Sequence, residues 1–419
     1  MRRLVNPLER WNWHGAIDNN PLGIRVKIER KLSFDDFKFS VFKLIKKNPI
    51  LNVKIILDEN NHLCFDTENA SDCSINFFPK KEKDDWIRVV EHIFNTQSTF
   101  SEGPITTFIL IDDLEFSDII IITTHTIIDG MGLIYLINEL LILISNPNLE
   151  VENGMFPPPI EELIPEPLKL TKNLEDIKIP LLNKEKYKNV LHRPVSIQVI
   201  NIEKEKLNKL IDFGKENETT MHSILSCFFL ISFAKTFSER NLRRIGAISP
   251  ANLRPYLANE YQDFIGMYST PGLDISFNYS DIKGINSLDN IQNLIKKFNK
   301  KLKSRYEIKK IFDFTLFLTE NLHRIDDIAI NNLIDKNAEI GFAISNLGIY
   351  PFDLKYDNFK LLELNLISDP SYPSLKLMIN SFKDKMFINI LFKLDAFNSK
   401  DITRFKNNFF KIFEFIKNA

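Results

Sequence analysis

The sequence has 419 residues, 44% of them hydrophobic, so the chain is long enough to form two packed lobes. Its 54 lysines and arginines nearly balance its 55 aspartates and glutamates, which excludes a global charge that would attract nucleic acid, an anionic membrane surface or a polyanionic substrate. Three scattered cysteines without a C-x-x-C pair disfavour a disulfide framework or structural zinc and favour a reducing, cytoplasmic setting.

The first part of the chain predicts alternating strands and helices. Residues 23–32 alternate like a strand, and residues 33–48 have the apolar spacing of a helix that Ser33 caps and Pro49 ends. Further strands are predicted at 50–57, 62–66, 73–78, 105–112 and 118–125, and a further helix at 84–97. An apolar helix follows the last of these strands. The longest apolar runs fall short of the roughly 18 residues that a membrane span needs, so we expect no transmembrane segment.

A proline-rich stretch divides this region from the rest of the chain. We expect an N-terminal lobe at residues 1–160, a crossover linker at 161–194 and a C-terminal lobe at 195–419. In the last of these, strands are predicted at 195–202, 244–250, 340–348, 360–368, 374–382 and 385–394. Helices are predicted at 203–215, from Thr219 or Thr220 to 237, over much of 286–335, and at 399–418. The basic run at 296–310 is either a solvated helix face or a contact for phosphate groups.

The stretch "HTIIDG" interrupts an apolar segment between a predicted strand and the helix after it. His125 is a candidate general base, because imidazole exchanges protons near neutral pH and a strand end can direct the ring into a cleft. Gly130 would let a tight turn bring Asp129 back to the histidine. The alternative is a core histidine followed by an aspartate that caps the next helix. Metal-binding, dinucleotide-binding and serine-nucleophile motifs are not matched.

"HTIIDG" resembles the H-x-x-x-D-G motif of the chloramphenicol acetyltransferase-like superfamily, which includes alcohol acetyltransferases and condensation domains. "SPANLRPYL" at 249–257 is similar to its Asn-x-Arg segment, and "ISNLGIY" at 344–350 to its late Ser-Asn-x-Gly segment. The resemblance implies an α/β fold of two similar lobes, each a mixed sheet with flanking helices, and an active-site tunnel between the lobes. Since Thr124 stands where condensation domains usually carry another histidine, the stand-alone branch fits better.

The resemblance also implies roles for individual residues. His125 would be the base, Asp129 would pair with Arg254 and, with Gly130, support the site, because a buried carboxylate needs such a partner. Ser345, Asn346 and the backbone around Gly348 would contact the oxyanion or substrate, as would Asn252. For these last four residues, an ordinary turn or strand exit is the alternative.

These roles describe an acyltransferase of secondary metabolism. It would move an acyl group from acyl-CoA, a co-substrate and not a permanently bound cofactor, to a hydroxyl or amine of a small-molecule acceptor, without an acyl-enzyme. One alternative is a free-standing condensation-type enzyme that takes its donor from an acyl carrier protein. The other is a catalytically silent binding protein of the same fold. No metal or nucleic-acid partner is expected.

Overall fold

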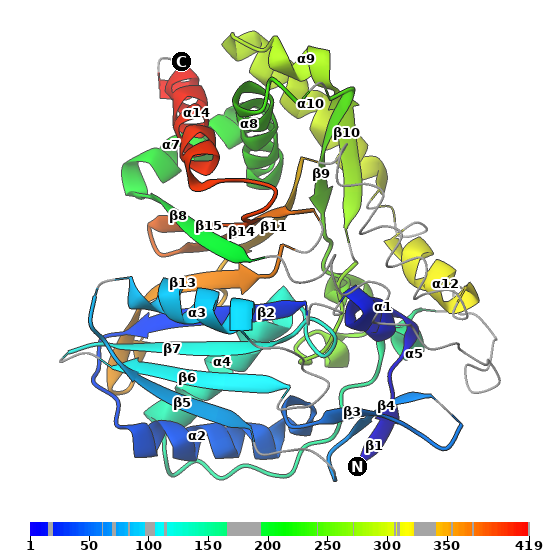
Figure 1. Cartoon of the computed structure of the whole chain (residues 1–419), viewed down its shortest axis with the longest axis vertical. Coiled ribbons are helices and arrows are strands. Elements are labelled where there is room, and N and C mark those ends of the chain that lie inside the picture. The colour runs from blue at the N-terminus through cyan, green and yellow to red at the C-terminus, as the bar shows by residue number, and fades with distance from the viewer. Residues whose placement is uncertain are drawn as a thin grey trace.

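Two six-stranded mixed sheets with flanking helices form two lobes, one above the other in Figure 1. The structure is a computed structural model, and it describes residues 1–15, 20–60, 62–68, 73–82, 84–96, 105–112, 115–165, 194–240, 242–270, 272–305, 307, 311–321, 341–352, 355–370 and 373–417. Most of the predicted linker at 161–194 lies outside the described residues. No helix in the described part of the chain is long and apolar enough to cross a membrane.

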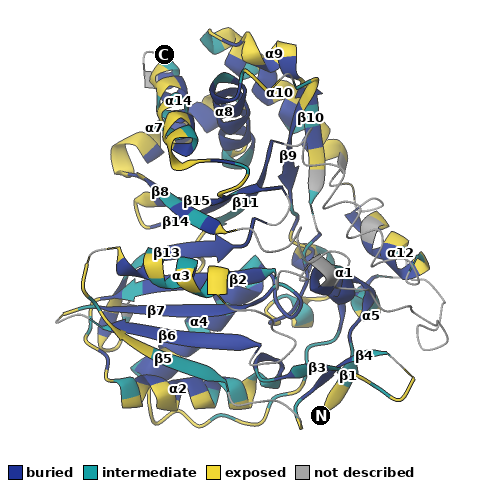
Figure 2. Cartoon of the chain, in the orientation of Figure 1, coloured by how far each residue is buried: buried dark blue, intermediate teal, exposed yellow. Residues whose placement is uncertain are grey.

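The sheet of the N-terminal lobe has the strand order β12-β13-β2-β7-β6-β5. Only β5 and β6 are parallel neighbours. The strands are β12 (Lys355–Tyr356), β13 (Phe359–Ser368), β2 (Pro21–Ile28), β7 (Ser117–Thr124), β6 (Thr106–Asp112) and β5 (Ser74–Pro79). The interior strands β6 and β7 are buried almost throughout (Figure 2), which explains why their sequences are nearly continuous in isoleucine, leucine and threonine.

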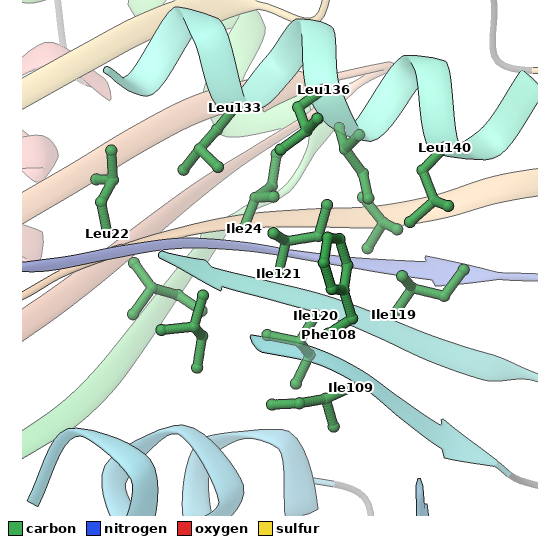
Figure 3. Packing of buried hydrophobic residues seen from close by; sticks show 14 of the residues in the cluster. Leu22, Ile24, Phe108, Ile109, Ile119, Ile120, Ile121, Leu133, Leu136 and Leu140 are labelled. Atoms are coloured by element: carbon green, nitrogen blue, oxygen red, sulfur yellow. The ribbon is translucent and has the colours of Figure 1, made fainter. Parts of the chain in front are cut away.

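Helices cover both faces of this sheet. Leu133, Leu136 and Leu140 of α4 (Gly130–Ser145) point onto one face, where Ile24 and Ile121 lie (Figure 3). On the opposite face, the Arg25 guanidinium lies over the ring of Trp86 from α3 (Asp85–Thr96). Helix α2 (Phe34–Lys47) packs against α4, and the Ser33 hydroxyl caps it by accepting from the Asp36 backbone N–H, as predicted. A small sheet of β1 (Arg2–Leu4), β4 (Leu63–Asp66) and β3 (Lys54–Leu57) lies beside this lobe.

The sheet of the C-terminal lobe has the order β10-β9-β11-β14-β15-β8. These strands are β10 (Leu273–Asn278), β9 (Arg244–Ser249), β11 (Phe342–Ile349), β14 (Leu375–Phe382), β15 (Lys385–Lys393) and β8 (Val195–Ile202). Its outer face is covered by α7 (Lys204–Glu216), α8 (Met221–Thr236), α9 (Tyr279–Lys283), α10 (Leu288–Arg305) and α14 (Ser399–Lys417) (Figure 1). Helix α8 is buried on almost every side, which accounts for its uniformly apolar sequence.

Strand β13 joins the two lobes. It comes from the C-terminal half of the sequence, yet it pairs along its length with β2 of the N-terminal sheet. The predicted boundaries assign all of 195–419 to the C-terminal lobe, so they do not anticipate that β13 enters the N-terminal sheet. Sequence patterns located the strand but not its partner, because alternation gives no information on which sheet a strand enters. The remaining elements are α1 (Pro7–Gly15), α5 (Ile160–Leu163), α12 (Asp313–Glu320) and the 3₁₀ turns at Pro49–Leu51, Arg254–Tyr256 and Asn259–Tyr261.

Candidate active site

His125 follows directly after the buried strand β7. Its backbone N–H donates to the carbonyl of Asn20, 3.0 Å away, just before β2 begins. A turn follows, in which the N–H of Ile127 donates to the carbonyl of Thr124 at 3.3 Å. These bonds hold the half-buried imidazole at the edge of the sheet where β7 ends and β2 starts.

The imidazole of His125 is neutral at ordinary pH. Burial, together with the nearby charge of Lys376, lowers its pKa to about 4, and the opposing effects of Asp129 and of the backbone at His125 and Ile128 are smaller. Nδ1 is buried and makes no hydrogen bond of normal geometry. A neutral ring has a lone pair with which to accept a proton, as a general base requires.

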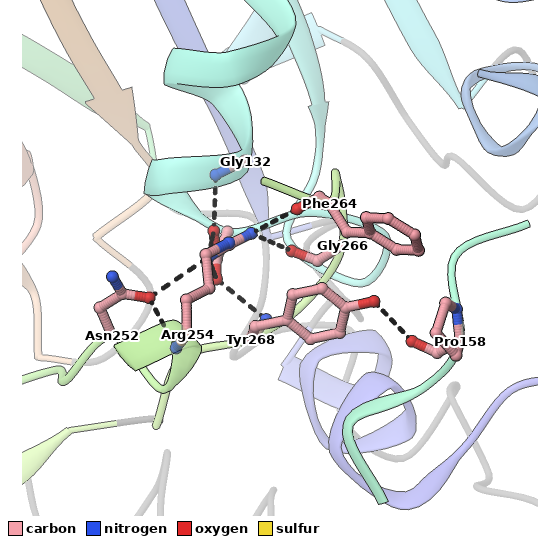
Figure 4. A network of polar contacts seen from close by, with 8 residues as sticks. Gly132, Pro158, Asn252, Arg254, Phe264, Gly266 and Tyr268 are labelled. Atoms are coloured by element: carbon pink, nitrogen blue, oxygen red, sulfur yellow. Dashed lines mark hydrogen bonds and ion pairs between the residues drawn. The ribbon is translucent and has the colours of Figure 1, made fainter. Parts of the chain in front are cut away.

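The Asp129 carboxylate is held by the Arg254 side chain and by the backbone N–H groups of Gly132 and Tyr268, the three partners that Figure 4 labels. Oδ1 accepts from the N–H of Gly132 at 2.7 Å, which makes Asp129 the N-cap of α4. Oδ2 accepts from the N–H of Tyr268 at 2.9 Å and from Nη1 of Arg254 at 2.7 Å. The helix-capping alternative and the ion pair implied by the resemblance are therefore both present.

Arg254 forms this ion pair with a geometry that differs from a two-nitrogen fork. Nη1 alone contacts both carboxylate oxygens, at 2.9 and 2.7 Å, while Nη2 donates to the carbonyls of Phe264 and Gly266 at 2.9 and 3.3 Å. The Gly266 carbonyl also accepts from the N–H of Asp129 at 3.2 Å. The Arg254 and Asp129 side chains are 3% and 2% exposed, so the pair is a buried connection between two segments 125 residues apart.

Other side chains approach Gly130 of the motif, and Gly132 just after it, closely. Gly130 does not have a positive φ, so the predicted turn role is not what requires glycine. A Cβ there would lie 3.0 Å from Cδ1 of Leu347 in the other lobe. A Cβ on Gly132 would lie only 2.6 Å from Cγ1 of Ile128. The sequence assigned no role to Gly132, because a packing constraint of this kind leaves no pattern in one sequence.

Ser345, Asn346 and Gly348 lie on β11, half-buried, and Leu347 brings this strand against the start of α4. A β-bulge interrupts the pairing with β14 between Asn346 and Ile349. Gly348 has a φ of 73°, and its N–H donates to Oδ1 of Asn346 at 3.0 Å. The structure thus brings the segment next to the motif, while contact with an oxyanion or substrate stays a prediction.

Asn252 is exposed, and its side chain serves Arg254. Its Oδ1 accepts from the backbone N–H of Arg254 at 3.2 Å, as in a turn. The same oxygen lies 3.4 Å from Nη1 of that arginine. The alternative of a turn residue therefore fits Asn252, and its proposed substrate contact stays a prediction.

Sequence reasoning missed Lys376, whose charge acts on His125, and the segment around Gly266 and Tyr268 that surrounds Asp129. The only signal for Lys376 was a lysine inside an apolar alternating strand. The basic run on α10 has Lys296, Lys297 and Lys300 exposed, which agrees with a solvated helix face. Among the described residues, no group of three or more histidine, cysteine, aspartate or glutamate side chains could hold a metal ion.

Comparison with solved structures identifies the fold. Trichothecene 15-O-acetyltransferase from Fusarium sporotrichioides superposes with a TM-score of 0.73 at 13% identity, covering 99% of this chain and 95% of that one. The first condensation domain of the CDA synthetase gives 0.66 at 10% identity, covering 99% and 95%. The chain has the chloramphenicol acetyltransferase-like fold. The resemblance predicted from the sequence is confirmed at this level.

Two further comparisons add a family-model match and a third solved structure. The alcohol acetyltransferase family model matches residues 182–369, a range that contains Arg254 and the Ser345–Gly348 segment but not His125. A starter condensation domain of rhizomide synthetase, solved as a variant with C8-CoA, has the chloramphenicol acetyltransferase-like fold too, with a TM-score of 0.65 at 10% identity, covering 96% of this chain and 90% of that one. No curated protein sequence matches the chain.

Proposed function

We propose that this protein transfers an acyl group from acyl-CoA to a hydroxyl or amine of a small-molecule acceptor, with His125 as general base. The observation that carries the proposal is a neutral histidine held at the junction of the lobes, beside a buried Asp129–Arg254 pair that fixes its loop. The fold shared with an acetyltransferase and the match to the alcohol acetyltransferase model support it.

In the proposed reaction, the acceptor oxygen or nitrogen attacks the thioester carbonyl while the imidazole takes its proton. Because Nδ1 is buried, Nε2 is the nitrogen that would take it. The tetrahedral intermediate then collapses, the C–S bond breaks, and the imidazolium returns the proton to the CoA thiolate. The products are an ester or amide and free CoA, and no acyl-enzyme forms. Ser345 and the backbone near Gly348 are the proposed donors to the oxyanion.

Replacing His125 tests the base. Purified protein is incubated with acyl-CoAs of graded chain length and a panel of alcohols and amines, and released CoA thiol is measured. His125→Ala is expected to lower kcat by roughly 10²–10⁴-fold, the usual contribution of a general base. The matched control is His92→Ala, which removes an exposed histidine on α3 and should leave the rate unchanged.

The same assay separates the alternatives. Full activity of His125→Ala, with an unchanged circular dichroism spectrum, would exclude the base role. Transfer from an acyl carrier protein but from no acyl-CoA would identify a free-standing condensation-type enzyme. Absence of transfer from both donors, across the whole acceptor panel, would favour a binding protein of this fold.

A further inference from the structure

One face of strand β14 is directed at the N-terminal lobe. Leu375, Leu377 and Ile379 belong to the core of the C-terminal lobe, whereas Met378 and Phe382 pack into the core of the N-terminal lobe. Because side chains alternate along a strand, Lys376 has the same orientation as Met378 and Phe382. It therefore lies between the lobes.

The pairing of three strands places Lys376 at the edge where His125 lies. Pro21 at the start of β2 pairs with Thr124 at the end of β7, and Leu22 pairs with Ser368 at the end of β13. The Nζ of Lys376 donates to the Ser368 hydroxyl, 3.3 Å away. The lysine is close enough for its charge to lower the pKa of the His125 imidazole.

The Lys376 ammonium has no carboxylate partner among the described residues. The charge of Asp369 raises the pKa of Lys376, but the Asp369 carboxylate forms its ion pair with Lys393, whose Nζ lies 2.9 Å from Oδ1. The Asp369 and Lys393 side chains are 3% and 4% exposed, so that pair is buried and neutral overall. Lys376 is half-buried, and among the described residues its ammonium makes a hydrogen bond to an uncharged hydroxyl and no ion pair. Since the charges of Asp369 and Lys393 are opposite, these three side chains together carry one excess positive charge beside the proposed base.

We propose that Lys376 binds a carboxylate group carried by the acyl acceptor. The inference rests on the proposed function, since it names the acceptor of that same site. A partly buried ammonium without a counter-ion is costly, and a substrate carboxylate would supply the missing charge and accept its hydrogen bonds. A single uncompensated ammonium matches a monoanion. Although burial lowers the pKa of Lys376 to about 8, the amine is still mostly protonated at neutral pH.

Matched pairs of acceptors test the proposal. The probes are hydroxy acids of graded chain length, each compared with its methyl ester, and binding is measured by NMR before any turnover. The wild-type protein should bind at least one acid more tightly than its ester. Lys376→Met should weaken binding of that acid, and raise its KM relative to that of the ester, by about tenfold, because it loses one charged contact. A change in kcat that follows from the altered pKa of His125 should be the same for acid and ester. The affinity for the ester should be unaffected, and Lys376→Arg should restore most of the affinity for the acid.

Lys385→Met is the control, because Lys385 lies on the neighbouring strand but pairs with Glu203 at the outer surface. The inference would be overturned if the wild-type protein bound no acid more tightly than its ester. It would also be overturned if the Lys376→Met variant bound the acid as tightly as the wild-type protein does. If Lys376→Met raised only the KM of acyl-CoA, and not that of an acyl thioester without phosphate groups, Lys376 would bind the phosphates of the donor. That result would also overturn the inference. Binding of the acid without any acyl transfer would instead contradict the proposed function and keep the anion site.

Discussion

At the scale of single residues, the buried Asp129–Arg254 pair is the contact on which the candidate site most depends. Asp129→Ala should lower the free energy of unfolding by about 3 kcal/mol or more, because it leaves a guanidinium uncompensated in the interior. Activity should fall as well, since the loop of His125 loses its anchor. Urea denaturation of both proteins at pH 7 measures the change.

A double variant provides the control. In Asp129→Ala with Arg254→Leu no unpaired charge remains, so the loss of stability should be smaller than the sum of the two single losses. Additive losses would argue that the two side chains act independently, against the pairing described here.

Sequence reasoning at this scale worked where a residue has a distinctive chemical pattern. The pairing of Asp129 with Arg254 was predicted because both fall within short motifs that resemble a known superfamily, while the role of His125 stays a prediction. Lys376 and the carbonyls of Phe264 and Gly266 were not predicted, because their positions follow from strand pairing and chain crossing far away in the sequence. Every residue has a backbone carbonyl, so residue type does not show which carbonyl will accept a hydrogen bond from a distant side chain.

At the scale of elements, the first turn of α4 is tightly packed against the loop before it. Gly132→Ala should destabilise the protein by about 1–3 kcal/mol, because the new Cβ would overlap Cγ1 of Ile128 in the loop that carries His125. Thermal unfolding followed by circular dichroism measures the loss. Gly284→Ala is a matched control, since its Cβ would meet nothing closer than the Ser280 carbonyl at 3.6 Å. If both substitutions changed stability equally, the close contact at Gly132 would not be the cause.

Elements with a strong apolar pattern were predicted to within a few residues. The buried strands β6 and β7 and the helices α2, α8 and α14 are examples. Strand β10 was missed, because it is an edge strand with Asp274, Ser276 and Asn278 at alternate positions and a short apolar pattern. Helix α1 was not predicted either. Its sequence mixes aromatic, polar and charged residues around Trp11 and Trp13 without a clear apolar stripe.

At the scale of the whole molecule, histidines make stability depend on pH. Burial lowers the pKa of His222 to about 4, from an ordinary value near 6.5, and its Nε2 lies 3.0 Å from the Ser249 hydroxyl. Between these two values the unfolded chain binds a proton that the folded chain does not, so stability is lost as pH falls. His125 acts in the same direction, whereas Glu161, whose pKa burial raises to about 7, acts in the opposite direction.

His222→Asn isolates one of these contributions, because asparagine keeps a polar partner for Ser249 but does not titrate. Between pH 7 and pH 4.5 the wild-type protein should lose about 2 kcal/mol more stability than the variant. Urea denaturation across that range measures the difference. If the free energy of unfolding fell equally with pH in both proteins, His222 would not be the titrating group.

The position of β13 in the N-terminal sheet has a consequence for synthesis on the ribosome. Strand β2 needs β13 on one side and β7 on the other, but β13 ends at Ser368, about 250 residues after β7. Until those residues have been made, β2 presents unpaired backbone groups and a row of isoleucine and valine side chains, which is the kind of edge that promotes aggregation. The N-terminal lobe therefore completes its fold only after β13 has been made. Until then, the open edge of β2 has to be kept from pairing with other chains.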